Sequence, residues 1–501
     1  MSESNDISIT IDADASPRVK HGADLVRAAL PGTQVRNVSI GVRGKGRLAN
    51  QPRGSQPPGG FRLLVGGDCS IDITSDDDSG ALYGCVELVE QLKSGKPLEA
   101  RLDAPVFRLR GPCIGMQKTY ILPGRKVYEY PYTDDLFPFF YDRALWTKYL
   151  DYLLTLRFNS LTLWNGHPFA SFVRVPKYDY AVEVSPEQFQ RNVDTLHWLT
   201  SECDKRGIWL LKSFYSLLLP KPFAEKHHCD TQLTAPTPEA SDYTREAIAA
   251  FVADFPNVGL MPCLGEALQG IDNQVYWCND VILEGIKQGA TRAGLKELPP
   301  VVLRTHATDA RVVIPKALQR YSNLYTEQKY NGESLTTYEP RGVRADLHRT
   351  MAALGSTHMV NVHILANLEP FRYGAQRFIQ NCMLASRDLL GAKGLHLYPL
   401  AYWNWPHSPD GDGHSLIQWE RDDMWFESWA RYSWNPDRDR DAERDYWVSD
   451  LAKRYGSVDA AGHILDALND SGECARASSA GSASPKAIAR RCRSACCSIS
   501  S

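Results

Sequence analysis

Acidic residues stand at the ends of apolar runs in the central part of the chain, and Glu266 is the most distinctive of them. It follows the apolar run 258–264, with Gly265 between. We expect the carboxyl group to emerge beside packed side chains, where partial desolvation would raise its pKa, as a general acid requires. The alternative role is a glutamate at a helix N-terminus that interacts with the helix dipole. We predict that Glu266 is a catalytic acid.

Further carboxylates follow later apolar runs and could form a pair with Glu266. Glu333 and Glu339 come after the sixth run, and Glu369 comes after the seventh. Glycoside hydrolysis uses two carboxyl groups on either side of the scissile bond, and their separation decides the stereochemical outcome. The residue pattern alone leaves all three open as the partner of Glu266.

The other residues at the run ends suit a hydroxylated substrate. Amides and carboxylates bind hydroxyl groups, aromatic rings cover sugar faces, and cations bind an anionic group. A solvated rim or a loop ion pair is the alternative for any single residue, but every run ends in polar residues. Lys212, Arg304, Lys329 and Arg341 are candidates for a substrate carboxylate, and Trp164 and Trp403 for stacking. The predicted substrate-binding residues are Trp164, Asn165, His167, Lys212, Arg304, His306, Lys329, Glu339, Arg341, His363, Asn367 and Trp403.

Other kinds of catalytic site find less support. The sequence has no GxSxG elbow and no Walker A motif, and its 12 Cys residues include no CxxC pair. The adjacent His227 and His228 lack the spacing that puts two ligands on one helical face. A metal site built from His167, His306, His363 and His396 is the less favoured alternative to substrate binding. We expect neither a metal nor a cofactor.

Eight apolar runs alternate with amphipathic helical stretches between residues 106 and 455, and these elements must position the candidate residues. This alternation predicts a (β/α)8 TIM barrel, in which catalytic groups lie at the C-terminal ends of the strands. An open doubly wound sheet is the alternative, but no GxGxxG follows the first run. Residues 1–105 read as a small α+β accessory domain with a helix over 85–92. Residues 456–501 read as a C-terminal helix followed by a tail whose Ser, Ala, Arg and Cys composition predicts disorder. The predicted strands are 109–116, 160–164, 208–214, 258–264, 301–306, 323–329, 359–366 and 394–400.

The overall composition narrows the classes of partner. The chain has 501 residues, 43% of them hydrophobic, and a net charge of −3. A chain this apolar can bury a large core, and a nearly neutral balance provides no general attraction to nucleic acid or anionic membranes. The N-terminus lacks the apolar segment of a signal peptide, and no apolar run is long enough to span a bilayer. We therefore expect a cytoplasmic carbohydrate-active protein that binds neither nucleic acid nor membrane.

Short motifs resemble those of known glycosidases. Residues 78–84 (Asp-Ser-Gly-Ala-Leu-Tyr-Gly) resemble the signature of the accessory domain that precedes the barrel in family 20 β-hexosaminidases and family 67 α-glucuronidases. The blocks 259–266, 329–333 and 338–341 are similar to the α-glucuronidases. This resemblance implies an inverting hydrolase.

The resemblance also implies roles for individual residues. Glu266 corresponds to the general acid, and Glu333 to one member of the carboxylate pair that activates water. The second member belongs on the seventh strand, where this chain has Asn361 and His363, so Glu369 or His363 would replace it. The family's C-terminal helical domain often serves dimerisation, which makes a homodimer an expectation.

We therefore expect an α-glucuronidase-like exo-hydrolase that removes a terminal uronic acid from a polysaccharide fragment. One alternative is another exo-glycosidase, such as a β-N-acetylhexosaminidase-like enzyme. The family 20 mechanism needs an Asp-Glu pair after the fourth strand, and Gly265 precedes Glu266 here, which disfavours it. The other alternative is a barrel that binds carbohydrate without catalysis.

Overall fold

The computed structural model describes residues 7–164, 169–255, 257–333, 335–363, 374–408 and 416–479. Its N-terminal part is an accessory domain with a mixed five-stranded sheet of order β1-β2-β4-β3-β5. Strands β1, β2 and β4 are parallel, while β3 runs antiparallel to both β4 and β5. Two helices pack on this sheet and on each other. The elements are β1 Ser8–Thr10, α1 Pro17–Ala29, β2 Asn37–Val42, β3 Phe61–Val65, β4 Ser70–Ser75, α2 Asp78–Ser94 and β5 Arg101–Asp103.

The glycosidase-like motif 78–84 forms the first two turns of α2. The sequence predicted a helix only from Cys85, but α2 begins at Asp78 because the Asp77 side chain accepts a hydrogen bond from the Gly80 amide. Gly80 lies so close to the sheet that a Cβ there would be 2.1 Å from the Gly60 carbonyl oxygen. The motif therefore reflects tight packing of a helix on a sheet.

The central part of the chain is a closed barrel of eight parallel strands, which confirms the predicted (β/α)8 fold. All eight predicted strands are present, with ends shifted by a few residues. The sixth strand of the barrel extends further than expected, to Glu333. The strands are β6 Leu109–Gly115, β7 Ser160–Trp164, β8 Trp209–Tyr215, β9 Val258–Cys263, β10 Val301–Arg304, β11 Leu324–Glu333, β12 Thr357–Val362 and β13 Gly394–Leu397.

Helices surround the barrel, and their apolar faces meet the outward side chains of the strands in one large core. Ser or Thr residues accept hydrogen bonds at the first turns of α4 and α6, where Pro occupies the first helical position. A π-helical segment, Trp277–Leu283, joins α7 to α8. The helices are α3 Arg143–Thr155, α4 Pro186–Lys205, α5 Lys221–Lys226, α6 Pro238–Asp254, α7 Ile271–Tyr276, α8 Glu284–Arg292, α9 Ala310–Leu318, α10 Val343–Ala353, α11 Gln376–Asp388, α12 Gln418–Arg421 and α13 Asp423–Trp434.

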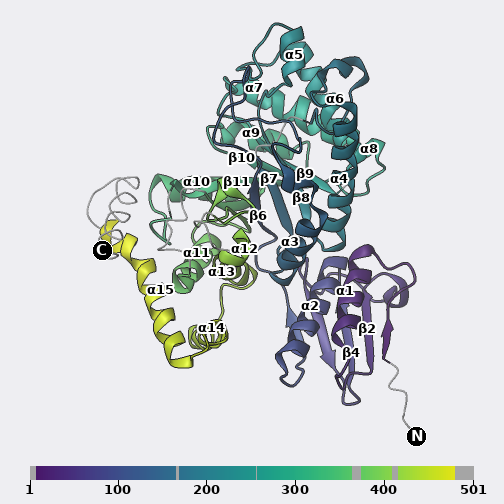
Figure 1. Cartoon of the computed structure of the whole chain (residues 1–501), viewed down its shortest axis with the longest axis vertical. Helices are drawn as coiled ribbons and strands as arrows, with labels where there is room; N and C mark the ends of the chain where they lie inside the picture. The colour runs from purple at the N-terminus through teal and green to yellow at the C-terminus, as the bar shows by residue number, and fades with distance from the viewer. Residues whose placement is uncertain are drawn as a thin grey trace.

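The accessory domain is attached to the N-terminal face of the barrel, opposite the predicted mouth. Trp434, at the end of α13, packs edge-on against Tyr83 of α2, with ring centroids 5.4 Å apart. The guanidinium groups of Arg110 and Arg157 lie 5.2 and 5.1 Å from the centre of the Trp434 ring. Figure 1 shows the accessory domain beneath the barrel, so its sheet does not border the mouth.

Two helices follow the barrel, α14 Arg440–Tyr455 and α15 Val458–Ser479. They pack on each other through Trp447, Leu451 and Leu465, and α15 also contacts α11. The expected boundary at residue 456 falls between them, and residues beyond 479 lie outside the described part of the chain. No helix among the described residues combines the length and hydropathy needed to cross a membrane.

A pair of buried histidines joins α10 to the outer side of β11 and β12. Nδ1 of His348 lies 2.8 Å from Nε2 of His358, and His348 Nε2 donates to the Tyr330 carbonyl oxygen at 3.0 Å. His358 Nδ1 lies 3.1 Å from the Thr326 hydroxyl. Both rings are buried, and burial disfavours the charged form of an imidazole. Burial accordingly lowers the pKa of His348 to about 4.

The free energy of unfolding is expected to fall as the pH decreases from about 6.5 to about 4. Between these two pH values His348 binds a proton in the unfolded chain but not in the folded protein. The contribution of neutral His348 to the free energy of unfolding is therefore complete above pH 6.5, and about 3 kcal/mol of it is lost on acidification. Urea unfolding at pH 7.5 and 4.5 measures it. His348→Gln should reduce the difference between the two pH values, and the exposed His463→Gln should not. An unchanged difference in His348→Gln would contradict the assignment.

Candidate active site

Arg304 is the central residue of the barrel mouth. It ends β10 and points into the barrel, where strand register places it beside Cys263 of β9 and Glu327 of β11. Its Nη1 donates to the Tyr215 hydroxyl at 3.2 Å, and the guanidinium lies 4.7 Å from the centre of the Trp164 ring. Arg304 is buried and permanently charged, so it needs anionic partners.

Glu327 supplies the inner negative charge. Its carboxylate is fully buried, with Oε1 3.8 Å from Arg304 Nε and Oε2 3.3 Å from Nδ1 of His396. Burial alone would raise the pKa of Glu327, but the hydrogen bond to His396 and the charges of His396, Arg304 and His363 outweigh it and hold the pKa below its usual range. The amide of Asn361 donates to the His396 carbonyl oxygen at 3.3 Å and so braces this histidine. Glu327 is therefore an ionised carboxylate inside the barrel.

Glu266 supplies the outer negative charge. Its Oε1 lies 3.7 Å from Arg304 Nη1 and 3.2 Å from His306 Nε2. A Cβ on Gly265 would lie 1.9 Å from the Ala307 carbonyl oxygen, so only glycine lets the loops after β9 and β10 approach closely enough for this contact. Three predicted residues, Glu266, Arg304 and His306, thus meet at the mouth.

The surroundings of Glu266 differ from the expected apolar ones. Its side chain is 40% exposed, so the partial desolvation that we expected from its position after a buried strand is largely missing. The reason is that the polypeptide leaves the barrel at Leu264, and Glu266 already stands on the open rim. The neighbour of Glu266 at the rim is His306, whose Nε2 lies 3.2 Å from its carboxylate.

Aromatic rings line the inner wall of the mouth. Trp164 lies 5.7 Å from the His396 ring and 5.5 Å from Tyr398, and His363 lies 5.0 Å from Tyr398. Trp164 is buried beneath Arg304, whereas Trp403 is 42% exposed and meets Tyr128 edge-on. Of the two tryptophans predicted for stacking, Trp403 is thus the one that offers an open ring.

Other predicted residues lie in different places. Lys329 faces into the barrel two residues beyond Glu327 and is buried. Glu339 and Arg341 form an ion pair at 3.2 Å in the exposed loop before α10, and they border a depression with α11 rather than the Arg304 cluster. Glu333 ends β11 at the mouth, but only its backbone is described. Asn165, His167, Asn367 and Glu369 lie outside the described residues.

Lys212 is separated from the mouth. It alternates along β8 with Leu211, which belongs to the barrel interior, so its side chain points outward toward the surrounding layer. Its Nζ lies 5.4, 5.6 and 5.8 Å from the ring centres of Tyr132, Phe169 and Phe172. Burial lowers the pKa of Lys212 to about 7. The structure thus corrects its prediction as a ligand for a substrate carboxylate: both faces of β8 are buried, so polarity in the sequence did not reveal the side chain's direction.

Lys212→Met is expected to raise the free energy of unfolding at pH 7 by about 2–3 kcal/mol. Burial among the aromatic rings disfavours the charged ammonium group in the folded protein, whereas the unfolded chain keeps it hydrated. Removing the amine therefore removes a cost of folding. The gain should vanish as the pH approaches 10, where the lysine is neutral in both states. Chemical denaturation at pH 7 and 9.5 tests this, with the exposed Lys226→Met as the matched control. A variant less stable than wild type at pH 7 would refute it.

The sequence assigned no role to Glu327 and considered His396 only as a metal ligand. The sequence did contain a signal for Glu327: Tyr325, Glu327 and Lys329 occupy alternate positions of β11 and therefore share one face of the strand. In the described part of the chain, no three His, Cys, Asp or Glu residues are grouped so that they could hold a metal ion. The described mouth therefore contains a series of alternating charges, Glu327, Arg304 and Glu266, with a histidine beside each carboxylate.

No protein-family model matches the sequence, and no curated protein is significantly similar to it. Solved structures do match. An enzyme of family GH138 that targets the pectin rhamnogalacturonan II is 42% identical, with a TM-score of 0.87 over 94% of this chain. This chain spans 56% of that enzyme's length.

Two more distant structures share the fold at 13% identity. One is a family GH115 4-O-methyl-α-glucuronidase with specificity for decorated arabinogalactans, with a TM-score of 0.56 over 93% of this chain and 61% of the other. The other is a β-N-acetylhexosaminidase from Bacteroides fragilis, with a TM-score of 0.53 over 90% of this chain and 91% of the other. These matches support a glycosidase barrel but give no particular support to family 67. The structural neighbours of this (β/α)8 barrel are glycoside hydrolases.

Proposed function

We propose that the chain is a glycoside hydrolase that removes a terminal uronic acid from a pectic polysaccharide fragment. The observation that carries the proposal is the meeting of Glu266, His306 and Arg304 at the C-terminal ends of β9 and β10. The GH138 enzyme, 42% identical over nearly the whole of this chain, targets the pectin rhamnogalacturonan II.

Glu266 is the proton donor in this proposal. It stands on the open rim, where a leaving oxygen can reach it, and His306 can return a proton to it after each turnover. Arg304 keeps the carboxyl group in place from below. The base that activates water is Glu333, whose backbone closes β11 at the same end of the barrel, with Glu369 as a second carboxylate; this pair would give inversion.

The preference for a uronic acid rests on cations at the floor of the mouth. Arg304 and Lys329 project inward from the neighbouring strands β10 and β11, and both are buried. A sugar carboxylate that reaches them would be desolvated and matched by charge, whereas a neutral sugar would gain no such interaction. Trp403 offers its exposed ring to a sugar face.

A panel of substrates tests the proposal. We expect release of a free uronic acid from oligosaccharides ending in galacturonate or glucuronate, and no release from matched substrates ending in galactose or N-acetylglucosamine. Proton NMR of the first product gives the anomeric outcome, expected to be inverted. Release of N-acetylglucosamine would instead indicate a hexosaminidase-like enzyme, and binding without any product would indicate a non-catalytic barrel.

A further inference from the structure

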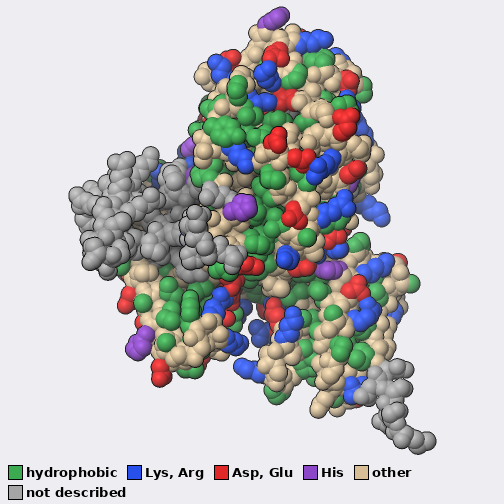
Figure 2. All heavy atoms as spheres, viewed as in Figure 1, with side chains coloured by type: hydrophobic (Ala, Val, Ile, Leu, Met, Phe, Trp, Pro, Cys, Tyr) green, Lys and Arg blue, Asp and Glu red, His purple; other side chains and the backbone are tan. Residues whose placement is uncertain are grey.

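A second polar cavity lies on the other face of the barrel, between the accessory domain and the C-terminal helices. Its volume is about 790 Å³, and α2, β5, the end of α3, α13 and α14 contribute its lining. Figure 2 shows charged side chains bordering the gap between these parts of the molecule. Because the accessory domain covers the N-terminal face, this cavity is remote from the mouth that contains Glu266.

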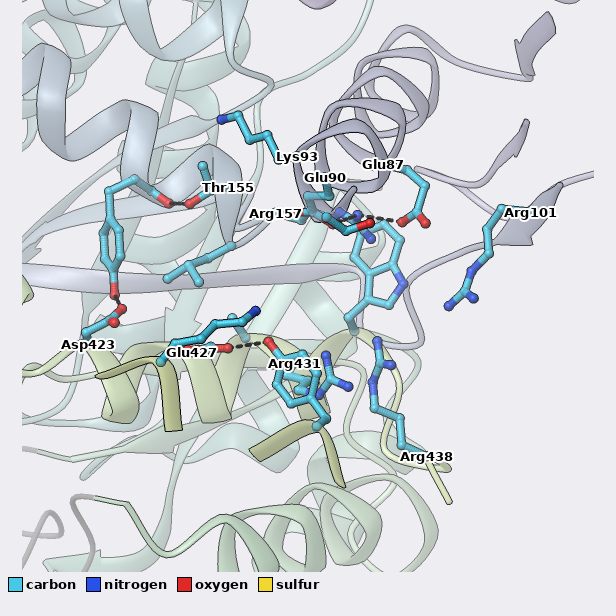
Figure 3. A pocket seen from close by; sticks show the side chains of 17 residues that line it. Glu87, Glu90, Lys93, Arg101, Thr155, Arg157, Asp423, Glu427, Arg431 and Arg438 are labelled. Carbon is cyan, nitrogen blue, oxygen red and sulfur yellow. Dashed lines mark hydrogen bonds and ion pairs between the residues drawn. The ribbon is translucent and has the colours of Figure 1, made fainter. Parts of the chain in front are cut away.

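Three arginines gather on one side of the cavity, and two of them form only long ion pairs. Both oxygens of Glu443 are held by Arg431, through two hydrogen bonds of 2.6 Å. Arg438 reaches the same carboxylate only at 3.9 Å, and Arg101 reaches Asp103 only at 3.7 Å. Within the part of the chain that the structure describes, these are the ion pairs of Arg438 and Arg101; over longer distances Glu90 and Asp103 also attract Arg438, and Glu87 attracts Arg101. Figure 3 shows Arg101, Arg431 and Arg438 around a common space.

The positive charge of Arg438 is only partly neutralised by its neighbours. Burial lowers the pKa of Arg438 and the charge of Arg431 lowers it further, while Glu443 and Asp103 oppose this shift without cancelling it. The side chain of Arg438 nevertheless keeps 19% of its surface exposed, and that of Arg101 keeps 44%, so both remain accessible from the cavity. An anion placed between them would relieve the repulsion and accept hydrogen bonds from both planar groups.

The opposite side of the cavity presents carboxyl groups. Glu427 accepts a hydrogen bond from the Tyr446 hydroxyl, and Asp423 accepts one from Tyr152. Burial raises the pKa of Glu427 to about 7, despite the nearby Arg454. These carboxyl groups can bind hydroxyl groups of a ligand, but they would repel a second negative charge.

We propose that this cavity is a second carbohydrate-binding site, for a saccharide that carries a carboxylate, with the carboxylate between Arg101 and Arg438 and its hydroxyl groups toward Asp423 and Glu427. The volume falls in the range of small-molecule sites and greatly exceeds that of a phosphate or sulfate ion. The proposal holds whether the barrel mouth hydrolyses its ligand or only binds it.

The experiment measures binding of digalacturonate by calorimetry to the full chain carrying Glu266→Gln, which prevents turnover at the mouth. Adding Arg101→Gln and Arg438→Gln is expected to abolish one binding event or weaken it at least tenfold. Arg320→Gln is the matched control, because Arg320 is an exposed arginine with a 2.7 Å ion pair to Asp280. A neutral disaccharide should not bind the cavity.

Thermal unfolding provides a second readout. Without ligand, Arg438→Gln is expected to be at least as stable as wild type, since it removes a poorly neutralised charge; with digalacturonate, wild type should gain more stability than the variant. The single Arg101→Gln variant, in an exposed edge strand, serves if the double variant does not fold.

Unchanged digalacturonate binding in these variants would overturn the proposal, as would its displacement by equimolar inorganic phosphate. Loss of hydrolysis in Glu266→Gln with cavity binding retained separates this site from the mouth.

Discussion

Glu266→Gln is expected to reduce kcat for uronide release by about 10²–10⁴-fold while leaving the free energy of unfolding nearly unchanged. Glutamine has the same shape as glutamate and can still contact His306 and Arg304, but its amide cannot donate the proton that the leaving oxygen needs. Because the side chain stands on the exposed rim, the substitution leaves no buried group unpaired. Steady-state kinetics on a natural oligosaccharide, together with chemical denaturation, measure both quantities.

The dependence of the activity loss on the leaving group distinguishes a general acid from other roles of Glu266. An aryl uronide whose leaving group needs little protonation should lose far less activity in Glu266→Gln than the oligosaccharide does. Glu339→Gln is the matched control, since Glu339 is an exposed carboxylate in the loop after β11 that does not join the Arg304 cluster. Equal turnover of the oligosaccharide by wild type and Glu266→Gln would remove Glu266 from the acid role.

Glu327→Gln is expected to lower the free energy of unfolding by about 3–5 kcal/mol and to abolish activity as well. The substitution leaves Arg304 buried without its inner negative charge and weakens the hydrogen bond with His396, because the remaining acceptor is neutral. An uncompensated buried charge is costly, and a released Arg304 no longer holds Glu266 at the rim. Denaturant unfolding gives the loss of stability, and kinetics near 10 °C on the remaining folded protein give the loss of activity.

The contrast between the two variants tests whether Arg304 depends on both carboxylates, Glu327 on its inner side and Glu266 on its outer side. Glu266→Gln should affect activity alone, whereas Glu327→Gln should affect both activity and stability. Replacing Arg304 by Met in the Glu327→Gln background should recover part of the stability, because it removes the charge that was left unpaired, but no activity. A Glu327→Gln protein as stable as wild type would show that Arg304 does not depend on this carboxylate.

The barrel could be predicted because its strands and helices are encoded locally. Apolar runs of five to eight residues separated by amphipathic helices specify the βα alternation, and the polar residues after each run mark the mouth. Glu266 and His306 could each be assigned to the mouth for the same reason, since the C-terminal ends of parallel strands lie side by side. The start of α2 was missed because Asp77 acts as its cap only when the chain turns there.

The sequence by itself determined the (β/α)8 architecture, the accessory domain before it and the outer residues of the mouth. Only the tertiary structure decided which side chains of the buried strands face inward. In a parallel barrel both faces of a strand are covered, so hydrophobicity does not distinguish them. Closure of the sheet turned Glu327 inward, against Arg304, and Lys212 outward, into an aromatic cage. The cavity lined by Arg101 and Arg438 likewise exists only because segments far apart in the sequence pack together across two domains.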